Sequence, residues 1–165
     1  EDTLIESQGF DLITMGHSEG PGCYCFVNNL IRGYLERLTR TYRHIVVDCE
    51  AGLEHLSRRT AGKPDRLVCV VNRARMSAET VRSALGIYRD LHGGLPGQVD
   101  LVLNGLDRGD ALAANLRETA SGGDPRFTHE FCIPWDPAVS ALDGAGRSLL
   151  ELPPDAPALA ALEGW

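Results

Sequence analysis

The chain has 165 residues, 43% of them hydrophobic, and its 16 basic and 23 acidic side chains leave a net charge of -7. This is enough for one domain with a buried core, and the acidic balance argues against a general nucleic-acid binder. No apolar run approaches the roughly 18 residues of a membrane span. Five cysteines, an odd number, do not indicate a disulfide framework, so we expect a soluble, cytoplasmic protein.

The first part of the chain predicts a strand from Phe10 to Met15, then a glycine-rich loop that contains Cys23 and Cys25, then a helix that begins near Phe26. The positive end of a helix favours the thiolate form, which is the form that binds metal. Two thiolates make only half of a closed metal site, and a second copy of the chain could supply the other half across a two-fold axis. The alternative is a pair of reduced thiols that bind nothing.

The rest of the chain alternates short apolar runs with helical patterns. The expected strands are His44 to Asp48, Leu67 to Val71, Val99 to Asn104 and about Thr128 to Ile133. The expected helices are the one that begins near Phe26 and continues to Tyr42, a short one ending near Arg59, one capped by Ser77 and stopped by Gly93, one from about Asp107, one capped by Asp136 with Pro137 in its first turn, and one from about Asp155. This alternation predicts a mostly parallel sheet with helices on both faces.

Ligands of such sheets collect at the carboxyl ends of the strands. Cys23, Asp48, Asn104 and Pro134 each follow an expected strand end, so we expect them along one edge of the molecule. The remaining cysteines lie in or beside apolar runs and are expected to be ordinary buried thiols: Cys49, Cys69 and Cys132.

Three segments resemble the CooC family of carbon monoxide dehydrogenase nickel-insertion accessory ATPases: Gly16 to Cys25, Asp48 to Thr60, and Ile133 to Pro137. That family is similar to the cell-division regulator MinD and the nitrogenase iron protein, which are P-loop ATPases that dimerise around nucleotide. The resemblance covers nearly the whole chain from Phe10 onward. It implies a single α/β domain over residues 1–165 with a P-loop NTPase-like fold of the SIMIBI/MinD type. It also implies a homodimer, ATP or ADP with magnesium as cofactors, and carbon monoxide dehydrogenase or a similar nickel enzyme as partner.

The resemblance also implies roles for single residues. Asp48 would hold the magnesium ion through water, and Gly52 would lie in the switch segment that senses the terminal phosphate. Cys23 and Cys25 would bind zinc or nickel, and sulfur ligands alone do not choose between these metals. The alternative is that Asp48 is an acidic turn residue that ends the strand.

Asn104 resembles the asparagine with which the family recognises the adenine base, because an amide offers both a donor and an acceptor. A plain turn residue before Gly105 is the alternative. Pro134, Trp135 and Asp136 would form the loop that packs along the base, and a capping role is the alternative there.

The largest departure from the family is that no Gly-x-x-x-x-Gly-Lys-Ser/Thr sequence or lysine-rich variant occurs in these 165 residues. The family carries this loop near its amino terminus, on a strand and helix that precede everything seen in this chain. We therefore expect the chain alone not to hydrolyse ATP. We also expect its sheet to close up or to pair strands with another copy. A second departure is that Val71 to Met76 lacks the aspartate expected after that strand.

Two accounts fit these features. In the first, the chain is the carboxyl-terminal portion of an ATP-dependent metallochaperone. We favour this account because the first residue is not methionine. In the second, it is a nucleotide-independent relative that keeps the cysteine loop as a metal-binding or protein-docking module. A remnant of a chromosome-partitioning ATPase is a weaker third account, because the chain is acidic and has no basic amphipathic tail.

Overall fold

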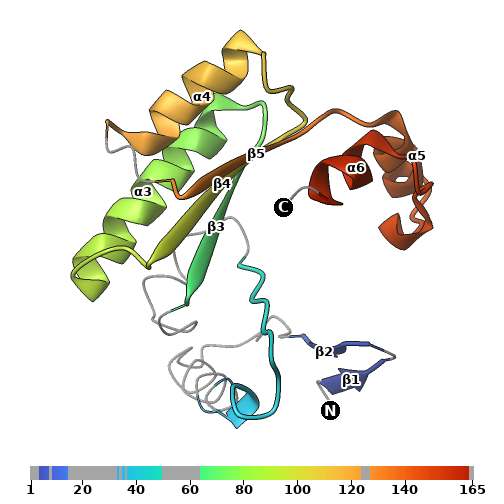
Figure 1. Cartoon of the computed structure of the whole chain (residues 1–165), viewed down its shortest axis with the longest axis horizontal. Helices are drawn as coiled ribbons and strands as arrows, with labels where there is room; N and C mark the ends of the chain where they lie inside the picture. The colour runs from blue at the N-terminus through green and yellow to red at the C-terminus, as the bar shows by residue number, and fades with distance from the viewer. Residues whose placement is uncertain are drawn as a thin grey trace, which may run out of the picture.

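A three-stranded parallel sheet forms the centre of the computed structural model, which describes residues 4–7, 9–14, 33, 35, 37–49, 64–123 and 127–163. The sheet has the order β3 (Arg66–Val71), β4 (Gln98–Asn104) and β5 (His129–Ile133), so that β4 lies in the middle (Figure 1). All three strands were predicted. β3 and β4 are short apolar runs bounded by turn residues, which is the pattern of a buried parallel strand, whereas β5 begins with His129 and Glu130 and is only partly buried.

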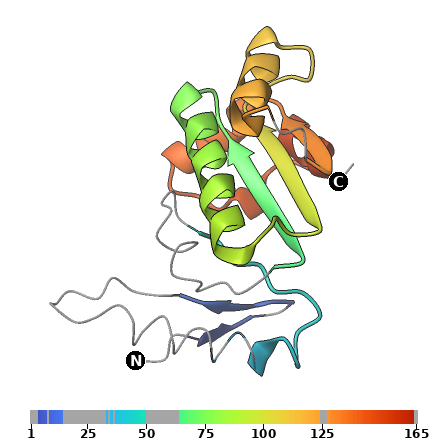
Figure 2. The same ribbon diagram turned by 90° about the vertical axis from the view of Figure 1, so that its left-hand side faces the viewer.

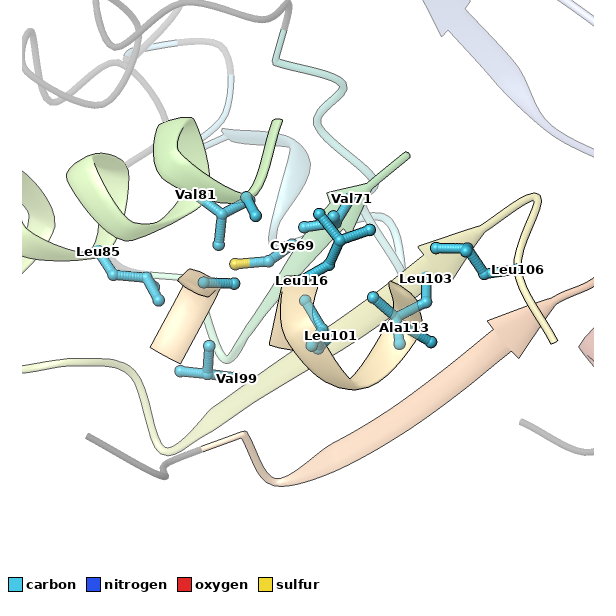
Figure 3. Close-up of a cluster of buried hydrophobic side chains, with 12 residues drawn as sticks. Cys69, Val71, Val81, Leu85, Val99, Leu101, Leu103, Leu106, Ala113 and Leu116 are labelled. Atoms are coloured by element: carbon cyan, nitrogen blue, oxygen red, sulfur yellow. The ribbon is translucent and has the colours of Figure 1, made fainter. Parts of the chain in front are cut away.

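One face of this sheet is covered by α3 (Arg75–His92) and α4 (Ala111–Ser121). Figure 3 shows side chains of both helices gathered over β3 and β4. The buried cluster consists of Cys69, Val71, Ala78, Val81, Leu85, Val99, Leu101, Leu103, Leu106, Ala113, Leu116 and Ala120. Its members alternate along β3 and β4, because successive side chains of a strand point to opposite faces.

The ends of these helices follow local capping rules with one exception. Gly93 ends α3 with φ 71° and Asp110 caps α4 by accepting from the amide of Leu112 at 2.8 Å. The expected cap at Ser77 is wrong, because α3 already begins at Arg75 and the Ser77 hydroxyl donates to the carbonyl of Ala74 at 2.7 Å. The helix expected from about Asp107 corresponds to α4, which begins only at Ala111.

The last part of the chain forms α5 (Pro137–Gly144), the 3-10 helix η1 (Leu149–Glu151) and α6 (Pro157–Glu163). Figures 1 and 2 place α6 on the opposite side of the sheet from α3, and α6 contacts β5. Helices therefore flank the sheet on both sides. Cover on the second side is partial, since the side chains of Val68 and Val70 on β3 remain 38% and 55% exposed.

A buried carboxylate lies at the other end of β4 from Asn104. Asp100 is fully buried; its Oδ1 lies 3.0 Å from Nδ1 of His129 and its Oδ2 lies 3.3 Å from Nε of Arg66. These neighbours come from β5 and β3, so the carboxylate of Asp100 contacts side chains of both outer strands. A buried charge is tolerated when it is paired in this way.

The amino-terminal strand does not join this sheet. β2 (Asp11–Ile13) lies within the expected strand from Phe10 to Met15, but it pairs antiparallel with β1 (Leu4–Glu6) in a separate hairpin. The hydroxyl of Tyr42 donates to the carboxylate of Asp11, and this hydrogen bond raises the pKa of Tyr42. Of the helix expected from Phe26 to Tyr42, the described residues 33, 35, 37 and 38 are helical.

The expected strand from His44 to Asp48 is wrong. Residues 44–49 have no strand pairing, and the side chain of Val46 is 93% exposed. An apolar, β-branched run favours a strand, but a strand also needs a neighbour to complete its hydrogen bonds, and no described strand pairs with this one. Cys49, at the end of this run, is exposed rather than buried.

Candidate functional site

The carboxyl ends of β4 and β5 finish level with each other. Asn104 is the last residue of β4 and pairs in register with Ile133, the last residue of β5. The amides of Gly105 and Leu106 both donate to the carbonyl of Ile133, at 2.8 and 3.0 Å. These bonds bring Asn104 beside Pro134, as the sequence predicted for this edge of the sheet.

The side chain of Asn104 is exposed at this edge. Within the described residues, its amide makes no hydrogen bond, so both its donor and its acceptor are available to a ligand. The chain then turns at Gly105, which has φ 74° and thus a conformation that side chains with a Cβ rarely adopt. This arrangement fits a planar ligand with paired donor and acceptor groups, such as a purine edge.

The loop after β5 divides into an exposed part and a buried part. Trp135 is 64% exposed and offers an indole face, whereas Asp136 is only 3% exposed. Oδ1 of Asp136 accepts from the amide of Ala138 at 2.9 Å, and Oδ2 accepts from the amide of Ala158 at 3.1 Å. Asp136 therefore caps α5, which is the alternative role that the sequence left open for it, and it also bonds to the first turn of α6. Its expected contact with the base stays a prediction, and both of its carboxylate oxygens are already bonded.

Arg73 is a residue of this edge that the sequence reasoning did not select. Nη1 of Arg73 donates to the carbonyl of Gly105 at 3.0 Å and lies 3.8 Å from Oδ2 of Asp110. The neighbouring Asn72 accepts from the amide of Ala74 at 2.9 Å and so turns the chain into α3. The position of Arg73 two residues after the end of β3 is the sequence signal that marks it.

Of the remaining expected site residues, only Asp48 lies in the described part of the chain. Asp48 lies in the unpaired, exposed stretch 44–49. Cys23, Cys25 and Gly52 lie outside the described residues, so their roles stay predictions. Across the parts of the chain that are described, no group of three His, Cys, Asp or Glu side chains could hold a metal ion.

Two of the other cysteines behave as ordinary thiols, as expected. Burial raises the pKa of Cys69 to about 12, with a smaller contribution from the charge of Asp100. Burial is also the main cause that raises the pKa of the half-buried Cys132. Both thiols stay protonated at neutral pH, which makes them poor metal ligands.

Comparison with known proteins identifies relatives for nearly the whole chain. It is 30% identical over 169 aligned positions to the carbon monoxide dehydrogenase accessory protein CooC of Rhodospirillum rubrum, an alignment that covers 93% of this chain and 57% of CooC. This similarity along nearly the whole chain supports a place in the CooC-like group of P-loop ATPases. It is also 41% identical over 88 positions to the uncharacterized ATP-binding protein MJ0685 of Methanocaldococcus jannaschii, which covers 53% of this chain and 35% of that protein.

The chain thus spans about a third to somewhat more than half of the length of these relatives. No protein-family profile matches it, and no solved structure matches it. The three-stranded parallel sheet with its flanking helices agrees with the α/β, P-loop NTPase-like fold of the group. Among the described helices, none is both long and apolar enough to cross a membrane.

Proposed function

We propose that this chain is the carboxyl-terminal portion of a nucleotide-dependent, homodimeric accessory ATPase that supports nickel insertion into carbon monoxide dehydrogenase in the cytoplasm. The observation that carries the proposal is the carboxyl edge of the sheet, where the amide of Asn104, which has no hydrogen bond within the described residues, lies beside the loop of the exposed Trp135. The similarity to CooC along 93% of the chain supports the same reading.

The donor set at this edge fits the base of a nucleotide. Asn104 would meet the purine edge through its amide, and Pro134 with Trp135 would lie along the ring. Asp48 would hold magnesium through water and Gly52 would follow the state of the terminal phosphate. ATP supplies the free energy of hydrolysis when it is bound, whereas these side chains bind and orient it.

Cys23 and Cys25 would bind the metal, which is nickel as cargo or zinc as a structural ion. Two chains would together provide four thiolates, the number that a closed sulfur site requires. If the cysteines lie at the start of the helix that the sequence predicts, the positive helix end would favour their thiolate form. Metal binding and dimer formation would then depend on each other.

The function is tested in cells that make carbon monoxide dehydrogenase but lack the gene for this chain. The expected result is an enzyme poor in nickel, measured by metal analysis of the purified enzyme. The intact gene and a Cys49→Ser control restore nickel, whereas Cys23→Ser does not. Full nickel occupancy without the gene at limiting nickel contradicts the proposal.

A second candidate is a nucleotide-independent metal-binding or protein-docking module. The absence of a P-loop sequence from these 165 residues favours it. The same cells separate the two functions through Asn104→Ala. Loss of nickel in that variant supports the nucleotide-dependent protein, and unchanged nickel supports the nucleotide-independent module.

A further inference from the structure

A groove lies between the carboxyl ends of α3 and α4, at the opposite edge of the sheet from the candidate nucleotide site. Its apolar floor consists of Leu85 on α3, Val99 at the start of β4 and Phe127 before β5. Figure 3 shows Leu85 and Val99 at the end of the buried cluster away from Leu106. Two lobes share Val99 and Phe127, one of about 210 Å³ beside α3 and α4 and one of about 330 Å³ beside residues 95–97.

The charged side chains that line this groove are positive. Arg82 and Arg89 lie two turns apart on one face of α3 and both line the groove. Among the described residues that line either lobe there is no acidic side chain. Within the described part of the chain, Arg82 makes no hydrogen bond or ion pair. The groove therefore combines an apolar floor with a cationic rim.

Gly86 keeps this groove open in the middle of α3. Glycine weakens a helix at such an interior position, so its presence needs a reason. Tight packing is not that reason, because a Cβ added at Gly86 would meet no atom of the described residues within 4 Å. By contrast, a Cβ added at Gly122 would lie 2.9 Å from Cδ of Arg82, so the stem of this arginine lies against the end of α4 at the rim of the groove.

We propose that this groove binds a small carboxylic acid with an unbranched apolar chain, of the medium-chain fatty acid class. The planar guanidinium of Arg82 offers paired donors that match a carboxylate. The apolar chain lies over Leu85, Val99 and Phe127, where its burial removes apolar surface from water. A chain suits this space because the two lobes run from Arg82 on α3 to Thr128 before β5. The site is separate from Asn104 and does not rest on the proposed nucleotide-dependent function.

The test is a nuclear magnetic resonance titration of the ¹⁵N-labelled 165-residue chain with octanoate. Binding is read from the backbone amides of Gly86, Gly97 and Gly122, with the amide of Gly105 at the other edge as a reference. A ligand of this size is expected to have a dissociation constant of about 1 mM. Octanamide carries the same chain without the charge and should bind about fivefold more weakly, because an ion pair at an exposed rim adds a modest free energy. Acetate, which has the charge without the chain, should give no saturable shift.

Two pairs of variants test the floor and the rim separately. Gly86→Leu should abolish binding because the new side chain fills the groove, and leucine favours the helix so that the fold is kept. Gly86→Ala is its matched control and should still bind octanoate. Arg82→Gln keeps the stem and removes the charge, so it should weaken octanoate about fivefold and leave octanamide unchanged. Arg75→Gln removes a charge from the start of α3, outside the groove, and should change neither affinity.

The contrary outcomes are equally distinct. A wild-type chain that gives no saturable shift at octanoate concentrations well above the expected dissociation constant overturns the proposal. Octanoate that binds to a folded Gly86→Leu variant as tightly as to the wild type lies elsewhere on the chain and also overturns it. Equal affinities for octanoate and octanamide, or equal losses in Arg82→Gln and Arg75→Gln, would overturn the assigned class of ligand. Thermal unfolding of each variant shows that it is folded, and Arg82→Gln decides the matter if Gly86→Leu is not.

Discussion

Replacing Asp136 with alanine removes one carboxylate that serves two helices. Oδ1 caps α5 through the amide of Ala138, and Oδ2 accepts from the amide of Ala158 in the first turn of α6. Asp136 and Ala158 are only 3% and 7% exposed, so water cannot easily replace the lost acceptor. We therefore expect Asp136→Ala to destabilise the chain more than the loss of a single exposed cap.

The magnitude follows from the two contacts. Loss of an N-cap side chain costs about 1 kcal/mol of the free energy of unfolding. A buried amide left without an acceptor costs about 1–3 kcal/mol more. The sum for Asp136→Ala is about 2–4 kcal/mol. Asp110→Ala is the matched control, because Asp110 caps one helix, α4, and its other contact is an exposed pair with Arg73 that adds little; this substitution is expected to cost about 1 kcal/mol.

The assay is equilibrium unfolding in urea, followed by circular dichroism. The variants are compared using one common slope of the unfolding free energy against urea concentration. Asp136→Asn adds an internal check. It keeps one carbonyl oxygen for α5 and should fall between the wild type and Asp136→Ala. The reasoning is refuted when Asp136→Ala loses no more stability than Asp110→Ala.

Further predictions concern other parts of the chain. Because burial raises the pKa of Cys69 to about 12, its thiol should resist iodoacetamide at pH 8 in the native chain, as measured by peptide mass; labelling as fast as that of the exposed Cys49 would show otherwise. The contribution of this protonated thiol to the free energy of unfolding is complete below its ordinary pKa of 9.0 and is lost as the pH rises toward 12. Cys69→Ala should therefore reduce the loss of stability at alkaline pH. The 165-residue chain alone should not turn over ATP, since the P-loop supplies most of the charge stabilisation; magnesium-dependent turnover that Asp48→Ala abolishes would contradict this. The outer edge of β3 has no partner among the described strands, so the chain should associate at high concentration and Val70→Lys should reduce this in sedimentation; a wild type that stays monomeric at every concentration would argue against it.

Local patterns predicted those elements whose neighbours reinforce them. The strands β3 and β4 are apolar runs with one face buried under α3 and α4, and their sequences carry this pattern without further information. The start of α5 is equally local, because Asp136 and Pro137 provide a cap and a fixed φ within two residues. Such features do not depend on which distant segment packs against them.

Features that depend on distant neighbours could not be predicted in the same way. The run from His44 to Asp48 has the composition of a strand, but its pairing depends on a partner that the run itself does not specify. The start of α3 was misplaced because Ser77 bonds to the carbonyl of Ala74 instead of capping the helix. The bond from Arg73 to Gly105 depends on the way the end of β3 meets the turn after β4, and no local pattern encodes that distance.

A metal titration followed by native mass spectrometry tests the proposed shared cysteine site, and with it the metallochaperone function, most directly. Zinc and nickel are added in separate experiments to the wild type and to Cys23→Ser, Cys25→Ser and the control Cys49→Ser. The account predicts one ion per two chains in the wild type and the control, and loss of both the ion and the dimer in the other two variants and on adding chelator. One ion per single chain, or a dimer indifferent to these substitutions and to chelator, would contradict it.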